Sequence, residues 1–211
     1  MAAAAYAAAA PHAAAYTATL QPASPNTLYL QVGNGAFSGG STYLTNNGRW
    51  SGATGAHDGT VNTVSVTVPA AVVGNGTPQT MTTDSSAANS YLDGYLFCNL
   101  PNQLYIGGYY RRTSQSNGVA PVVASVPANL VNASGHTIPF SQISWTSSGN
   151  GDGNAAQPFP AGSFVGGTQQ SIGSFASNQW AESCWTFSYR NTVVPAGGVY
   201  TGTVTFTVTT P

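Results

Sequence analysis

Charged side chains are almost absent from this chain of 211 residues, and lysine does not occur at all. Charged residues make up 4% of the sequence, whereas a typical soluble domain carries about 25%. A surface with so few cations has no basic stripe, which argues strongly against nucleic acid as a partner. Solubility must depend on uncharged polar side chains, and the net charge of −1 favours association between copies over repulsion.

Long apolar runs and cysteines are also scarce. No stretch of about 20 residues is apolar enough to predict a membrane-spanning helix. The Ala-rich start, MAAAAYAAAAPHAAAY, lacks the basic segment and leucine-rich core of a signal peptide. The two cysteines, Cys98 and Cys184, predict one disulfide if the chain is secreted, and two buried thiols are the alternative. We expect the disulfide because the rest of the composition is typical of an extracellular protein.

Motifs that would indicate catalysis or metal binding are missing. There is no G-x-S-x-G element, and His57 and Asp58 stand in a polar, loop-like stretch. The segment NGDGN, residues 150–154, resembles the start of a calcium loop, but Ala155 and Ala161 occupy positions that need glycine and glutamate. No two histidines have helical i, i+4 spacing, and no two acids are marked as a catalytic pair. The sequence therefore predicts no enzyme, no metal site and no cofactor.

The features that are present indicate β-structure. Asn-Gly pairs, which suit tight hairpin turns, separate short β-rich segments. In VNTVSVTVP, residues 61–69, Val64, Val66 and Val68 alternate with other residues at the period of a half-buried strand. We predict an all-β fold, an immunoglobulin-like or jelly-roll-like β-sandwich. Residues 22–211 would form this single domain, and residues 1–21 would form an N-terminal extension.

Aromatic residues are abundant and allow two interpretations. The side chains of the four tryptophans, Trp50, Trp145, Trp180 and Trp185, have the shape to stack on sugars. Core packing is the more ordinary use, because aromatic side chains suit pleated sheets. Trp185 follows Cys184 directly, which favours a position in the core around a disulfide. We favour core packing, and carbohydrate binding by an exposed tryptophan stays open.

The two ends of the chain carry related strand patterns. In YTGTVTFTVTT, residues 200–210, Val204, Phe206 and Val208 point to one face and threonines point to the other. An uncharged strand of this kind at a sheet edge invites pairing with another chain. Near the N-terminus, a second short strand pattern also has its apolar residues on one face, namely Tyr16, Ala18 and Leu20.

The run VPAGGVYTGTVTFTVT, residues 194–209, resembles the closing strand of spore coat protein U-like domains, the archaic chaperone–usher pilins. The resemblance implies an immunoglobulin-like sandwich without its last strand, in which the N-terminal extension of one subunit fills the groove of the next. It also implies a head-to-tail polymer of identical subunits, with a periplasmic chaperone and an outer-membrane usher as partners. The donor strand would contain Tyr6, Tyr16, Ala18 and Leu20. The acceptor strand would contain Tyr200, Val204, Phe206 and Val208.

These patterns support three hypotheses of function. The first is a structural subunit of an extracellular, cell-surface filament, a pilus or fimbria that assembles by donor-strand complementation. The second is a secreted carbohydrate-binding or adhesive β-sandwich module. The third is a coat or capsid-like shell protein.

Overall fold

The computed structural model describes residues 27–39, 42–45, 55–57, 60–112, 118–151 and 156–209. Several sequence predictions fall outside these ranges. They concern the N-terminal extension of residues 1–21, its candidate donor residues Tyr6, Tyr16, Ala18 and Leu20, and the tryptophan Trp50.

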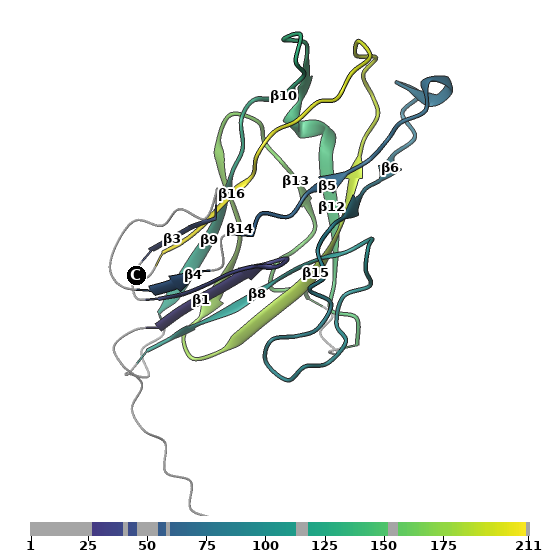
Figure 1. The fold of residues 1–211 in the computed structure, drawn as a ribbon. Helices are drawn as coiled ribbons and strands as arrows, with labels where there is room; N and C mark the ends of the chain where they lie inside the picture. The colour runs from purple at the N-terminus through teal and green to yellow at the C-terminus, as the bar shows by residue number, and fades with distance from the viewer. Residues whose placement is uncertain are drawn as a thin grey trace, which may run out of the picture.

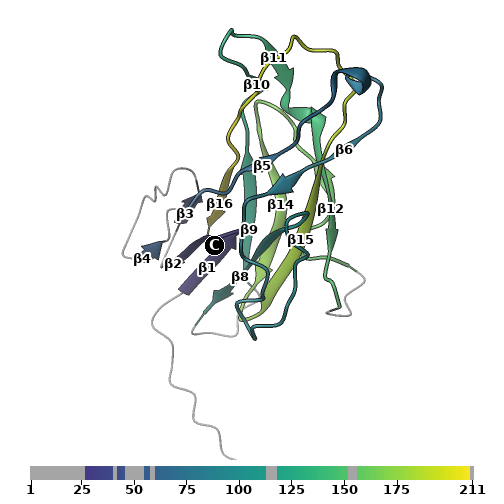
Figure 2. The same ribbon diagram turned by 45° about the vertical axis from the view of Figure 1, so that its right-hand side comes forward.

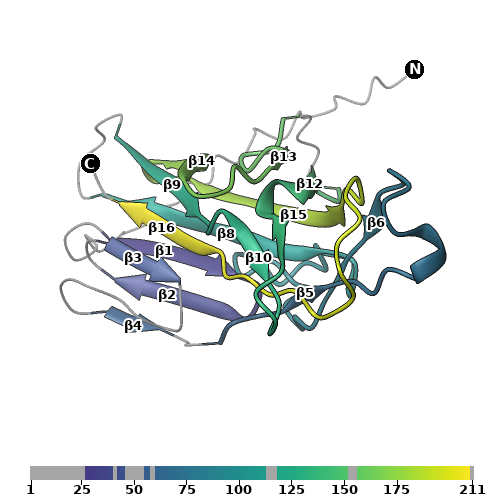
Figure 3. The same ribbon diagram turned by 90° about the horizontal axis from the view of Figure 1, so that it is seen from above.

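Two antiparallel sheets pack face to face as an all-β sandwich, as the sequence predicts (Figures 1 and 2). Neighbouring strands of the larger sheet are, in order, β13 (Gly162–Ser163), β12 (Ile143–Ser148), β15 (Trp180–Tyr189), β8 (Leu104–Arg111), β1 (Thr27–Val32), β2 (Gly35–Gly39) and β4 (Gly55–His57); β6 (Gln79–Thr80) also pairs with β15. The order in the smaller sheet is β14 (Gln169–Ala176), β9 (Val119–Ser125), β16 (Thr205–Thr209) and β3 (Thr42–Thr45). Figure 3 shows the two layers from above.

Short elements connect and cap the two layers. Two small strand pairs complete the β-structure: β5 (Val64–Ser65) with β7 (Thr82–Thr83), and β10 (Asn129–Val131) with β11 (Thr137–Pro139). The 3₁₀ turns are η1 (Ala70–Val72) and η2 (Phe140–Gln142). Within the described ranges, no helix has the length and apolar composition needed to cross a bilayer.

The core lies between the sheets and follows the period-two pattern of the strands. In β9, Ala120, Val122 and Ala124 are buried while the residues between them are more exposed, because successive side chains of a strand point to opposite faces. The segment of residues 61–69 is shorter as a strand than the sequence predicts, since only Val64–Ser65 forms β5. Its predicted face is nevertheless confirmed, because its alternating valines pack against the core: Val64, Val66 and Val68.

The C-terminal strand β16 has the predicted faces but not the predicted free edge. Phe206 and Val208 belong to the core, and Val204 packs against it. One edge of β16 pairs with β9, and the other pairs with β3, where Phe206 lies opposite Thr45 and Val208 opposite Tyr43. The expectation of an open acceptor edge along β16 is therefore wrong. A segment about 160 residues earlier in the chain already occupies that edge, and the alternation within β16 contains no information about it.

The predicted disulfide is confirmed. Cys98 and Cys184 are bonded, with their Cα atoms 5.5 Å apart and a sequence separation of 86. Together with Phe97 and Tyr105 they form a second, smaller buried cluster. Tyr105 and Cys184 stand opposite each other on β8 and β15, between neighbours that belong to the main core. The small cluster therefore lies on the outer face of the larger sheet, where residues 84–103 cross β8 and β15 (Figure 2).

Candidate functional site

Three aromatic side chains form a row on the outer face of the larger sheet, and we call them the aromatic row. Strand register places Tyr29 of β1 opposite Tyr109 of β8, and Tyr109 opposite Trp180 of β15. The ring centroids of Tyr29 and Tyr109 are 5.7 Å apart, and those of Tyr109 and Trp180 are 5.8 Å apart. Cross-strand pairs of aromatic residues stabilise a sheet, but here they also create a continuous aromatic surface.

A fourth ring reaches the aromatic row from the loop of residues 89–97. Tyr91 stacks on Tyr29 with ring centroids 4.7 Å apart, and its ring is tilted only 15° from that of Trp180 at 6.2 Å. Tyr91 is 65% exposed, whereas Tyr29 beneath it is 5% exposed. Burial, followed by the neighbouring phenols of Tyr91 and Tyr109, raises the pKa of Tyr29 well above its usual value. The Tyr29 hydroxyl therefore stays neutral, and it donates a hydrogen bond to Gln31 Oε1 at 2.7 Å.

Hydrogen bonds connect residues within the 89–97 loop. The N–H of Ser90 donates to the carbonyl of Tyr95 at 2.8 Å, and the N–H of Tyr95 donates to Asp93 Oδ1 at 2.9 Å. Phe97 is buried beside the disulfide at the end of the loop. The loop nevertheless leaves four large apolar side chains exposed to solvent: Tyr91, Leu92, Tyr95 and Leu96.

A buried tyrosine supports this loop from below. The Tyr105 hydroxyl donates to Glu182 Oε2 at 2.7 Å. Burial and then Glu182 raise the pKa of Tyr105, while a backbone hydrogen bond from Tyr91 acts in the opposite direction. Gly107 leaves room for this contact, because a Cβ there would lie 2.8 Å from the Cβ of Glu182. Tyr105 therefore connects the only glutamate of the chain to the backbone of the 89–97 loop.

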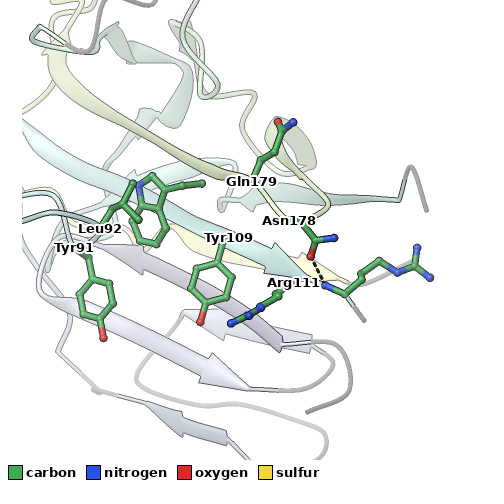
Figure 4. Close-up of a pocket in the computed structure, with 8 residues that line it drawn as sticks. Tyr91, Leu92, Tyr109, Arg111, Asn178 and Gln179 are labelled. Atoms are coloured by element: carbon green, nitrogen blue, oxygen red, sulfur yellow. Dashed lines mark hydrogen bonds between the residues drawn. The ribbon is translucent and has the colours of Figure 1, made fainter. Parts of the chain in front are cut away.

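Beside the aromatic row the surface is hollowed, with a volume of about 560 Å³. We call this the aromatic hollow. It is lined by Tyr91, Leu92, Tyr109, Arg111, Arg112, Asn178, Gln179 and Trp180. Figure 4 shows Tyr91 and Leu92 on one side of Tyr109, with Arg111 and Asn178 on the other. Aromatic walls with a few convergent polar groups are typical of small-molecule sites.

Asn178 fixes the polar side of the aromatic hollow. Its backbone is left-handed, with φ of 61°, a conformation in which asparagine is enriched. Its N–H donates to the carbonyl of Tyr110 at 2.7 Å, and its side-chain oxygen accepts from the N–H of Arg112 at 2.8 Å (Figure 4). The turn before β15 is therefore tied to the end of β8, and both segments contribute to the same hollow.

The structure assigns different positions to three of the four tryptophans, the fourth, Trp50, being outside the described residues. Trp145 and Trp185 are buried in the main core, as the core-packing interpretation predicts, while Trp180 lies in the aromatic row. Tyr29, Tyr91 and Tyr109 are not among the site residues predicted from the sequence. The signal for Tyr29 was present in TLYLQV, where Leu28 and Leu30 share one face and Tyr29 takes the other.

The candidate acceptor residues are not part of this site. Phe206 and Val208 belong to the smaller sheet, and Tyr200 and Val204 precede β16 in the chain. Cys98 and Cys184 are near the site, because they hold the end of the 89–97 loop. Within the described part of the chain, no three histidine, cysteine or acidic side chains gather as a metal site would need.

No family model matches this chain, and neither does any curated protein or solved structure. The function must therefore be argued from the geometry of the site.

Proposed function

We propose that this protein is a secreted β-sandwich module that binds carbohydrate in the aromatic hollow. The observation that carries the proposal is the aromatic row with Tyr91 stacked against it, because a flat, apolar ring surface complements the apolar face of a sugar ring. Tyrosine and tryptophan also supply polar atoms for the sugar hydroxyls. The disulfide Cys98–Cys184 fits a protein that works outside the cell.

The exposure of the 89–97 loop favours binding over packing. Full burial of one large apolar side chain is worth about 1.5–3 kcal/mol, and this loop leaves Tyr91 and Leu92, which line the aromatic hollow, largely in water. Exposed apolar patches on soluble proteins mark interaction sites. Because hydrogen bonds, Phe97 and the disulfide already order the loop, a ligand would not have to meet the entropy cost of ordering it.

The test is retention of the purified protein on insoluble polysaccharides of different sugar composition. We expect at least one polysaccharide to deplete the protein from solution, and we expect soluble oligosaccharides of the same sugar to release it. Heat-unfolded protein serves as the control for non-specific adsorption. Failure of every polysaccharide in the panel to retain the native protein would refute carbohydrate binding.

Filament assembly is the second candidate function. It needs an acceptor edge other than that of β16, because β3 already pairs with that edge. Within the described residues, β3 pairs on one side only, with β16, so the edge of β3 replaces that of β16 as the acceptor. An N-terminal extension from a sister copy would then add to β3 by β-augmentation. In this scheme the protein is a head-to-tail polymer at the cell surface, served by a periplasmic chaperone and an outer-membrane usher.

Deleting residues 1–20 is expected to abolish polymerisation if this second candidate holds, because the donor strand would be lost. Negative-stain electron microscopy of the full chain and of the truncated chain provides the measurement. Normal filaments from the truncated chain would exclude strand donation. Closed particles from the full chain would favour a shell protein instead.

A further inference from the structure

Positive charge is concentrated at the aromatic hollow. Two of the four arginines in the chain, Arg111 and Arg112, line it, and none of the acidic residues that the structure describes does. Two adjacent cations at the lining favour an anion at this part of the surface. Two carboxylates of the same region stay outside the lining: Glu182 accepts from Tyr105, and Asp93 accepts from the backbone of Tyr95.

The backbone and neighbouring rings position Arg112. Its N–H is bonded to Asn178, and its guanidinium carbon lies 5.8 Å from the centroid of the Tyr110 ring. A side chain at Gly118 would collide with the Arg112 guanidinium, so glycine there lets the arginine pack against the backbone. The buried Nε of Arg112 has no hydrogen-bond acceptor among the described residues. These contacts place the Arg112 guanidinium on the core side of β8, beside the core residue Tyr110 and the start of β9. Arg111 instead shares the outer face with Tyr109, two residues before it on the same strand.

We infer that the ligand of the aromatic hollow is an acidic saccharide that carries uronic acid carboxylates. A guanidinium group matches a carboxylate with two parallel hydrogen bonds, and charge-assisted pairs of this kind are about twice as strong as neutral ones. The aromatic row would stack on the sugar ring while Arg111 binds its carboxylate. The side-chain amides of Asn178 and Gln179 stand at the same side of the hollow, within reach of ring hydroxyls. This inference rests on the proposed carbohydrate-binding function.

Two matched ligands separate the contribution of the carboxylate charge to binding from the contribution of the sugar ring. Oligogalacturonate and its methyl ester have the same ring and hydroxyls, but only the free acid is anionic. Isothermal titration calorimetry at low ionic strength is expected to show at least about 10-fold tighter binding of the free acid. Added salt should weaken binding of the acid and leave binding of the ester almost unchanged.

Three single variants test which arginine binds the carboxylate of the ligand. Arg111→Gln is expected to lose most of the preference for the free acid, and Arg112→Gln to lose less of it, because the Arg112 guanidinium packs beside Tyr110. Arg190→Gln removes the same charge from an exposed position that does not line the hollow, and it should behave like the wild type. Far-UV circular dichroism of each variant checks that the fold is intact.

Each result bears on the inference in a defined way. Equal affinity for the acid and its ester, or binding of neutral saccharides only, would overturn the acidic ligand and leave carbohydrate binding in place. A preference for the acid that survives both Arg111→Gln and Arg112→Gln would also overturn it, because the charge would be recognised elsewhere. Absence of binding to any saccharide would refute the proposed function itself.

Discussion

Replacing Trp180 by alanine is expected to weaken saccharide binding by about 30-fold or more, the loss of roughly 2 kcal/mol that marks a binding hot spot. Trp180 contributes the largest ring of the aromatic row and contacts Tyr29, Tyr91 and Tyr109 through its ring. Its removal opens the floor of the aromatic hollow and leaves the other rings without support. Calorimetric titration with the saccharide that retains the wild-type protein measures this loss.

Tyr95→Ala is the matched control for this variant. Tyr95 is 55% exposed and belongs to the same loop as Tyr91, but it does not line the aromatic hollow. We expect Tyr95→Ala to bind saccharide as the wild type does. Wild-type affinity in Trp180→Ala would contradict the proposed site. An equal loss in both variants would indicate that a general change in the loop, and not the lost ring contact, impairs binding.

Removing the disulfide with the double change Cys98→Ser and Cys184→Ser is expected to lower the free energy of unfolding by about 4–5 kcal/mol. The bond closes a loop of about 86 residues. Without the bond the unfolded chain gains conformational entropy, and for a loop of this length that gain stabilises the unfolded state by about 4–5 kcal/mol. Urea unfolding followed by far-UV circular dichroism measures the difference. Saccharide affinity should fall as well, because Cys98 and Phe97 anchor the end of the 89–97 loop.

Reduction of the wild-type protein provides the control for the two serines. Dithiothreitol should destabilise the wild type by a similar amount and leave the double variant unchanged, since the variant has no bond to break. If the free energy of unfolding of the double variant is less than about 1 kcal/mol below that of the wild type, the contacts of Phe97 and Tyr105 hold the loop without the disulfide.

The sequence predicted what local periodicity determines. Alternation in the C-terminal segment placed Phe206 and Val208 on one apolar face, which the structure packs into the core, and the same pattern identified the shared face of the valines of residues 61–69. The two cysteines predicted the disulfide because a single pair leaves one pairing within the chain. These features depend on side-chain direction within one strand, which has a fixed period of two.

Long-range pairing could not be predicted in the same way. The edge of β16 is covered by β3, and nothing in the sequence of either strand specifies that neighbour. The contrast between Trp180 and Trp185 also depends on tertiary structure: the two lie on β15 an odd number of positions apart, so they point to opposite faces. Only the fold determines which of those faces is the core and which is the aromatic row.

Nuclear magnetic resonance mapping of the saccharide site tests the central claim most directly. The measurement follows backbone amide shifts of ¹⁵N-labelled protein during titration with the oligosaccharide that binds. If the aromatic hollow is the site, the largest shift changes should occur at Tyr91, Leu92, Tyr109, Arg111 and residues 178–180, while β14 and β9 of the smaller sheet stay unchanged. Shift changes centred on the smaller sheet, with none at the aromatic hollow, would contradict the account.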